Sequence, residues 1–167
     1  MSPTESTKPA QSVDSSDREI STTRVFDAPR ELVWKVWTEP EHIAKWWGPR
    51  GFSTTTEKMD VRPGGEWRHV MHGPDGKDYQ NRITYVEVVK PERIVYDHDS
   101  FPPFRAFVTF TAVGEKTELS MRMLFETAEL RDKTDKTFGA IKGQKETIDR
   151  LGEYVSVMQT AGNSSAS

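Results

Sequence analysis

Hydrophobic and polar residues alternate along most of the chain, and this period of two predicts β-strands. The alternating segments cover residues 19–26, 52–61, 66–71, 79–89, 94–99, 105–112 and 117–125. Short segments rich in glycine, proline and aspartate separate the later ones, as at 63–65 and 73–76. Consecutive strands joined by short turns are typical of an antiparallel meander, so we expect a sheet of about seven antiparallel strands.

A helical period replaces the alternation in two regions. After the first strand, Pro29 and Glu31 suit the first turn of a helix, and Pro40 ends that helix before a second short one over 41–47. Near the C-terminus, hydrophobic residues recur three or four apart from 128 to 160, which predicts one long helix. Gly139 and Gly143 lie inside it, where each costs about 1 kcal/mol relative to alanine.

The order of these elements predicts an α+β fold. A sheet of this length has one hydrophobic face, and the C-terminal helix is the predicted element long enough to cover it. Because a twisted sheet bends when one side is closed, we expect a curved antiparallel sheet wrapped around that helix. We expect residues 18–160 to form this domain. Residues 1–17 and 161–167 are small, polar or charged for the most part, and we expect them to be disordered tails.

The residues predicted to face inward combine large hydrophobic side chains with hydrogen-bonding groups. Alternate residues of a strand share one face, which places His69 beside Trp67, and Asn81 beside Ile83. Hydrophobic walls with a few oriented polar groups are typical of a ligand cavity. The predicted lining comprises Trp37, Trp46, Trp47, Trp67, His69, Met71, Tyr79, Asn81, Ile83, Tyr96, His98, Val108, Phe110, Met121, Met123, Phe138, Ile141 and Lys145.

Two interpretations of this inward face remain open. It lines a cavity for a small hydrophobic or amphipathic molecule, or it is a packed core whose polar groups pair with each other or with buried water. The adjacent Trp46 and Trp47 present a similar choice. We expect one of them to line the mouth of a cavity and the other to hold the short helices against the sheet.

The sequence contains no recognisable catalytic or metal-binding motif. His69, Tyr96, His98 and Lys145 are candidate acid–base groups, provided that they converge in a dry pocket. We rank catalysis below binding. His69 and His72 are three apart in a strand and point to opposite faces, so we expect no metal site, and we expect no cofactor.

Composition restricts the class of partner. The chain has 167 residues, a formal net charge of −3 and no dominant run of Lys or Arg, so a nucleic-acid partner is not indicated. It contains no bilayer-spanning hydrophobic run and no secretory signal, which predicts a cytoplasmic protein without integral membrane association. Cysteine is absent, which excludes disulfides. A monomer and a homodimer are both compatible with these features.

Six segments together resemble one protein family. They are FDAPRELVW at 26–34, WTEPEHI at 37–43, WWGP at 46–49, VRPGGEW at 61–67, PERIVY at 91–96 and DRLGEYV at 149–155. This set resembles the activator of heat-shock-protein-90 ATPase homologue-like family, which belongs to the START-like (SRPBCC) superfamily of polyketide cyclases, dehydratases and lipid-transport proteins. The resemblance extends from about residue 20 to residue 157.

This resemblance implies a helix-grip fold with a cavity between the sheet and the long helix. It leaves three functions open: binding, carriage or sensing of a hydrophobic ligand; catalysis of the polyketide cyclase or dehydratase type; and a co-chaperone-like interaction in stress response. The last predicts an exposed hydrophobic patch near residues 46–49. Many members of the family carry Gly-Trp in the last helix where this chain has Gly143-Gln144, which implies a larger or more polar pocket.

Overall fold

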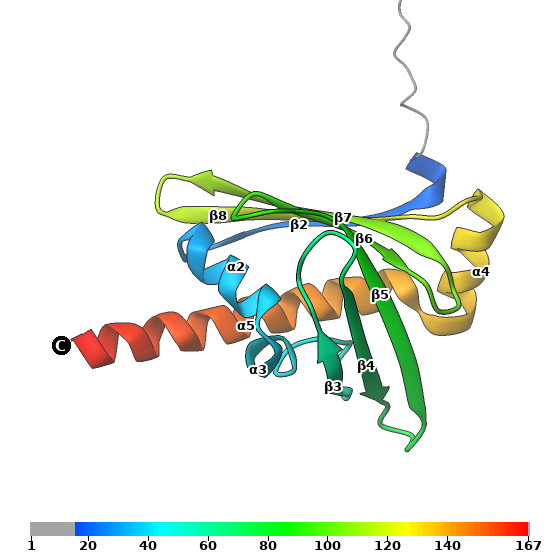
Figure 1. The fold of residues 1–167 in the computed structure, drawn as a ribbon, viewed down its shortest axis with the longest axis horizontal. Coiled ribbons are helices and arrows are strands. Elements are labelled where there is room, and N and C mark those ends of the chain that lie inside the picture. Colours follow the sequence, from blue (N-terminus) through cyan, green and yellow to red (C-terminus); the bar gives the residue numbers. More distant parts are fainter. Residues whose placement is uncertain (1–15, 167) are drawn as a thin grey trace, which may run out of the picture.

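The fold consists of one antiparallel sheet and a long helix that packs against its concave face (Figure 1). The computed structural model describes residues 16–166, with side chains described for 17–159. Residues 1–15 of the predicted N-terminal tail lie outside this range. In chain order the elements are η1 (Ser16–Arg18), β2 (Glu19–Phe26), α2 (Arg30–Thr38), α3 (Pro40–Ile43), β3 (Ser53–Met59), β4 (Glu66–His72), β5 (Asp78–Val89), β6 (Arg93–His98), β7 (Phe104–Val113), β8 (Lys116–Leu124), α4 (Ala128–Phe138) and α5 (Ala140–Ala166).

The sheet has seven strands in the order β2-β8-β7-β6-β5-β4-β3, and every neighbouring pair is antiparallel. Strands β3 to β8 form a meander, and the first strand, β2, pairs with the last one, β8. The two short helices connect the opposite edges of the sheet, β2 and β3. The predicted α+β architecture is therefore confirmed.

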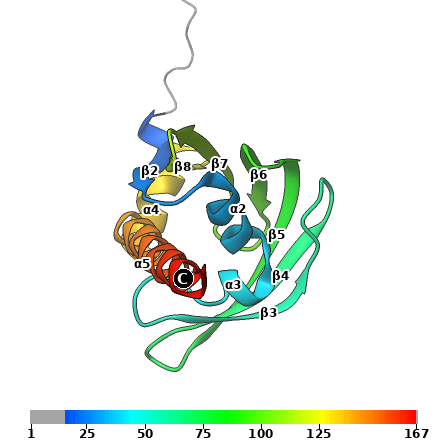
Figure 2. The same cartoon turned by 90° about the vertical axis from the view of Figure 1, so that its left-hand side faces the viewer.

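The sheet curves around helix α5, and in this view helices α2 and α3 lie inside the curve, between α5 and the strands (Figure 2). Two β-bulges contribute to this bend, because a bulge increases the local twist of its strand. The register shifts between Thr56 and Lys58 in β3 and between Tyr85 and Glu87 in β5. Without a shift, Glu87 would face inward like Tyr85, because alternate residues of a strand share one face. The alternation in the sequence of β5 therefore predicts a bulge before Glu87.

The predicted inward faces of the strands are confirmed by burial. In β8, Leu119, Met121 and Met123 are buried while the residues between them are partly exposed. Two inward residues near the ends of their strands are more exposed than the strand centres: Met71 is half-buried, and Tyr79 is 36% exposed. Both lie where the hydrophobic face of the sheet opens toward solvent.

The predicted single C-terminal helix is wrong, because the chain breaks it at Gly139. Gly139 has a φ of 65° and ends α4 in the left-handed conformation that favours glycine at helix C-termini. Its N–H donates to the carbonyl of Asp135, and the Asp135 carboxylate accepts from the N–H of Ile141 in the first turn of α5. Helix α5 then extends to Ala166, beyond the predicted end at residue 160.

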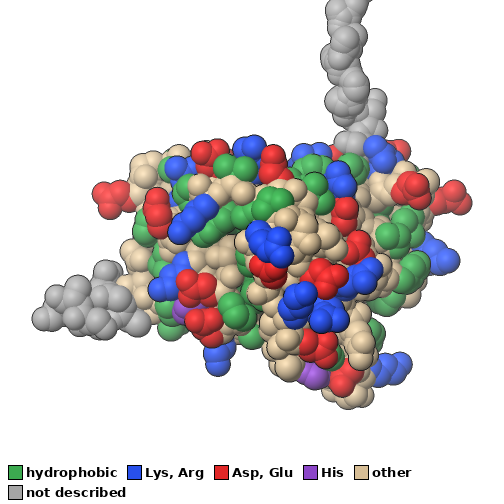
Figure 3. Space-filling view, viewed as in Figure 1, with side chains coloured by type: hydrophobic (Ala, Val, Ile, Leu, Met, Phe, Trp, Pro, Cys, Tyr) green, Lys and Arg blue, Asp and Glu red, His purple; other side chains and the backbone are tan. Residues whose placement is uncertain are grey.

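The surface carries both signs of charge. Figure 3 shows Lys and Arg side chains interspersed with Asp and Glu over the visible face. Several form ion pairs between neighbouring strands, such as Arg105 with Asp97 and Arg122 with Glu19. Within residues 16–166, no helix has the length and hydrophobicity needed to cross a membrane.

Candidate ligand-binding cavity

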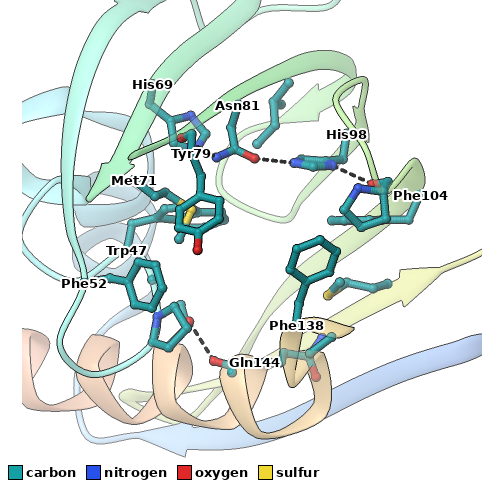
Figure 4. Close-up of a pocket in the computed structure, with 18 of the residues that line it drawn as sticks. Trp47, Phe52, His69, Met71, Tyr79, Asn81, His98, Phe104, Phe138 and Gln144 are labelled. Carbon is teal, nitrogen blue, oxygen red and sulfur yellow. Dashed lines mark hydrogen bonds between the residues drawn. The ribbon is translucent and has the colours of Figure 1, made fainter. Parts of the chain in front are cut away.

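A cavity of about 490 Å³ lies between the concave face of the sheet and the junction of α4 and α5. Strands β4, β5, β6 and β8 provide one wall, and the segments 47–52, 101–104 and 137–147 complete it (Figure 4). It is lined by Trp47, Gly48, Pro49, Phe52, His69, Met71, Tyr79, Gln80, Asn81, Ile83, Tyr96, His98, Phe101, Pro102, Phe104, Met121, Met123, Thr137, Phe138, Gly139, Ala140, Gly143, Gln144 and Thr147.

Aromatic rings from different elements flank the opening of the cavity. Phe52 and Tyr79 lie on one side with ring centroids 6.1 Å apart, and Phe138 lies on the other side (Figure 4). Phe138 also contacts Phe101 edge-on at 6.4 Å. Phe101 and Phe138 are 66% and 49% exposed, so these large rings meet solvent at the mouth.

His69 contributes to the wall and has one buried ring nitrogen. The ring is 2% exposed and stacks on Trp67 with centroids 3.7 Å apart. Its Nδ1 atom is buried and has no hydrogen-bond partner among the described residues. Burial lowers the pKa of His69 to about 3, and the nearby His98 adds to the shift. The ring is therefore neutral near pH 7.

His98 is held in place at both ring nitrogens. Nδ1 lies 2.7 Å from the carbonyl oxygen of Pro102, and Nε2 lies 2.7 Å from the side-chain oxygen of Asn81. Burial lowers the pKa of His98. A neutral ring carries one N–H, so it donates to only one of these two acceptor oxygens at a time. The ring also stacks on Phe104 at 4.7 Å, which fixes its orientation.

The cavity carries no fixed charge. Among residues 17–159, none of the lining side chains is Lys, Arg, Asp or Glu. Burial also raises the pKa of Tyr96, which keeps its phenol protonated. With both histidines neutral, the whole lining is uncharged near pH 7, although 29% of the chain consists of charged residues. Such a lining suits an uncharged ligand, because burying an unpaired charge is costly.

Arg150 anchors the loop that forms the Trp47 side of the cavity. From helix α5, its Nη1 donates to the carbonyls of Gly48 at 2.8 Å and Pro49 at 3.0 Å. The nearby Arg50 pairs with Glu153, also on α5. These contacts attach the segment after α3 to the long helix and so fix the position of Trp47.

A separate group of residues has the composition of a metal site. Glu39, Glu41 and His42 each bring one ligand atom to within 4.8 Å of the others, near the start of α3. His42 Nδ1 lies 2.7 Å from the Tyr154 hydroxyl. The sequence did not single out this group. It lies away from the cavity, and exposed acidic residues gather in this way without an ion.

A family model described as Activator of Hsp90 ATPase homolog 1-like protein matches residues 27–156. The chain belongs to this family. The match covers most of the strands and helices described above and confirms the resemblance seen in the sequence. A comparison with curated proteins gives no match.

Solved structures of bacterial proteins share the fold of this chain. A Nitrosomonas europaea protein is 25% identical with a TM-score of 0.79, covering 87% of this chain and 98% of its own. An Arthrobacter aurescens protein is 24% identical with a TM-score of 0.80, at 86% and 88% coverage. An Aeromonas hydrophila protein described as AHSA1-like is 22% identical with a TM-score of 0.69, at 84% and 94% coverage.

Many of the residues predicted to line a cavity line this one. They come from four strands, the loop after α3 and the end of helix α4: Trp47, His69, Met71, Tyr79, Asn81, Ile83, Tyr96, His98, Met121, Met123 and Phe138. Three of the four candidate acid–base groups, His69, Tyr96 and His98, line the same cavity. The structure therefore brings together the polar groups that the strand pattern placed on one face.

The remaining predicted residues lie elsewhere. Trp37, Trp46, Trp67, Val108 and Phe110 are in the packed core, and Trp37 contacts Trp46 with ring centroids 4.8 Å apart. Trp46 donates its indole N–H to the carbonyl of Val36 and so joins the turn after α3 to α2.

Two predicted residues of the long helix are corrected by the structure. Lys145 is exposed and is not part of the lining, and Ile141 packs at the edge of the core. Gln144 takes the inward position instead and is 5% exposed. The hydrophobic patch predicted near residues 46–49 is also wrong, because Trp46 and Trp47 are 0% and 9% exposed.

The sequence analysis missed most of the lining that comes from outside the strands. Phe52, Phe101, Pro102 and Phe104 lie in or next to loops, where a period of two carries no information. Gly139 and Ala140 line the cavity because the helix breaks there. The clustering of Phe101, Pro102 and Phe104 in an otherwise polar stretch was a usable signal, since exposed rings in a loop are unusual without a binding role.

Proposed function

We propose that this protein binds a small hydrophobic or amphipathic molecule in the cavity between the sheet and helix α5. The observation that carries the proposal is a cavity of about 490 Å³ with hydrophobic walls and a few fixed polar groups. This volume lies in the range of known small-molecule sites. Rings, thioethers and the polar heads of His69 and His98 surround this space instead of filling it.

The test is to identify what the protein carries. Native mass spectrometry of protein purified from cells would show a bound mass, and a thermal-shift screen of lipids and aromatic compounds would show which class raises the melting temperature. We expect stoichiometric binding of at least one uncharged hydrophobic compound. Absence of a bound mass together with no stabilising compound would contradict the proposal.

Acid–base catalysis in the same cavity is the second candidate, because His69, His98 and Tyr96 line it together. Binding is better supported. A histidine whose pKa is lowered to about 3 is a weak base near pH 7, and burial makes the Tyr96 phenol a weaker acid. Incubating the ligand with the protein and analysing it by mass spectrometry separates the two, since a carrier returns the compound unchanged.

A further inference from the structure

The hydroxyl of Tyr96 indicates how the cavity holds its ligand, an inference that rests on the proposed function. Tyr96 lines the cavity and is 2% exposed. Among the described residues, its hydroxyl has no hydrogen-bond partner. Buried hydroxyls usually have one, because each loses its hydrogen bonds to water on burial. A ligand can supply the missing partner.

The Tyr96 hydroxyl is accessible from the cavity. In the described part of the chain, the side-chain atoms that are fully enclosed without a partner are His69 Nδ1 and Thr134 Oγ1. The Tyr96 hydroxyl also lacks a partner but is not one of these enclosed atoms. Part of its surface is therefore open, and the open space beside Tyr96 is the cavity that it lines.

Tyr96 lies at the deep end of the cavity. It belongs to β6, the central strand of the sheet, and pairs with Tyr85 of β5 and Ala106 of β7. The rings of Tyr79 and Phe101, at the opening, are 36% and 66% exposed. A ligand that bonds to Tyr96 therefore has its polar end deep in the cavity and its hydrophobic part toward these rings.

The buried lining offers hydrogen-bond donors without partners. Burial raises the pKa of Tyr96, so the phenol keeps its proton and can donate it. The indole N–H of Trp47, which is 9% exposed, also has no partner among residues 17–159. A carbonyl oxygen suits such a lining, because it accepts two hydrogen bonds and brings no donor of its own.

We propose that Tyr96 donates a hydrogen bond to a carbonyl oxygen of the ligand and so anchors a hydrophobic carbonyl compound at the deep end of the cavity. Tyr96 is better suited to this role than Trp47. The indole of Trp47 is fixed by edge-on contacts with Trp37 and Trp67, whereas the phenol O–H rotates to meet an acceptor. Because water can bond to the hydroxyl in the free protein, the net gain is modest.

The test uses two uncharged probes with the same bicyclic skeleton, 1-tetralone and tetralin, of which the first carries a carbonyl group. Isothermal titration calorimetry measures both affinities for the full chain and its variants. Tyr96→Phe removes the hydroxyl and keeps the ring. It should weaken the binding of 1-tetralone about fivefold, as expected for one hydrogen bond, and change the binding of tetralin by less than about twofold.

Tyr85→Phe is the matched control, because Tyr85 is 3% exposed, pairs with Tyr96 across the strands and is not part of the lining. It should change both affinities by less than about twofold. The midpoint of urea unfolding should not fall in Tyr96→Phe, since the lost hydroxyl bonds to no described residue. If this variant does not fold, carbon NMR of wild-type protein labelled at tyrosine Cζ replaces it: 1-tetralone should shift the Tyr96 signal, and tetralin should not.

The outcomes separate this inference from the proposed function. Equal losses for both probes in Tyr96→Phe, or no loss for 1-tetralone, would overturn the inference while still supporting a ligand cavity. A selective loss of 1-tetralone binding in Trp47→Phe but not in Tyr96→Phe would overturn it as well. No saturable binding of either probe by the wild-type protein would contradict the cavity function and the inference together. A loss confined to 1-tetralone and to Tyr96→Phe supports both.

Discussion

Thr22 and Gln144 join the edge strand β2 to helix α5 through a hydrogen bond of 2.6 Å from the threonine hydroxyl to the glutamine oxygen. The nitrogen of the same amide donates to the carbonyl of Ile20 at 3.0 Å. Gln144 is 5% exposed, so its amide replaces water for two groups of the edge strand. The side chain thus holds the helix in register with the strand beside the cavity.

Replacing Gln144 with leucine should destabilise the fold by about 1–3 kcal/mol, because Thr22 and the Ile20 carbonyl lose their partner in a buried site. Urea denaturation followed by circular dichroism measures the change. Lys145→Leu is the matched control, since the neighbouring side chain is exposed and its replacement should change the free energy of unfolding by less than about 0.5 kcal/mol. Equal effects of both substitutions would contradict a special role for Gln144.

Arg150 offers a second test of how the cavity is held together. Arg150→Lys keeps the charge but cannot reproduce the guanidinium contacts with the carbonyls of Gly48 and Pro49. We expect a loss of about 1–3 kcal/mol in stability and faster amide hydrogen exchange over residues 45–52. Arg50→Lys alters an exposed ion pair with Glu153 and should cost less than about 1 kcal/mol. Unchanged exchange in Arg150→Lys would show that the loop is fixed by other contacts.

Stability should fall in mild acid because of His69. In the unfolded chain this histidine takes up a proton near its ordinary pKa of 6.5, whereas in the folded protein burial lowers the pKa to about 3. Between these values the unfolded state binds more protons, so stability is lost as the pH falls from 6.5 toward 3. His69 contributes a slope of up to about 1.4 kcal/mol per pH unit. Burial also lowers the pKa of His98, which acts in the same direction.

The measurement compares denaturant unfolding of the wild-type protein and His69→Phe at several values between pH 7.5 and pH 4.5. The variant removes one of the groups that are forced to stay neutral, so its stability should depend less steeply on pH. A steeper or identical slope in the variant would be inconsistent with a neutral, buried His69.

Gly139→Ala tests the break between α4 and α5 by the sign of its effect. A left-handed φ of 65° disfavours alanine, so we expect a loss of about 1 kcal/mol even though an added Cβ would meet no described atom within 4 Å. Gly139→Asn should cost less, because asparagine tolerates this conformation better. If the two helices were continuous, alanine would instead stabilise the chain by about 1 kcal/mol. Thermal denaturation of the three proteins distinguishes these cases.

The strands and their faces could be predicted from the sequence because both depend on a period of two within each segment. The pairing of β2 with β8 could not, since it joins residues about a hundred positions apart and leaves no local signal. Parity also shows which face a side chain occupies but not how deep it lies. For this reason parity predicts Trp67 and Phe110 in the cavity wall, whereas both lie in the packed core and outside the lining.

The helix contribution to the site was harder to predict. The inward stripe of α5 follows Ile141, Gln144 and Ile148, and a buried amide there is recognisable only from its partners on β2. Lys145 falls near the same hydrophobic stripe in the sequence, between Ile141 and Ile148, but its side chain is exposed. The expected cytoplasmic location, the oligomeric state and the domain limits at residues 18–160 stay predictions.

The most direct test of the cavity is a titration with N-phenyl-1-naphthylamine, an uncharged dye whose fluorescence rises in hydrophobic sites. Two variants of the same helix provide the comparison: Ala140→Trp places a large ring at a lining position, and Lys142→Trp places it on an exposed one. We predict saturable one-to-one binding by the wild-type protein and by Lys142→Trp, and at least about tenfold weaker binding by Ala140→Trp. Binding that is absent from the wild-type protein, or unchanged in a folded Ala140→Trp, would contradict a ligand site between the sheet and helix α5.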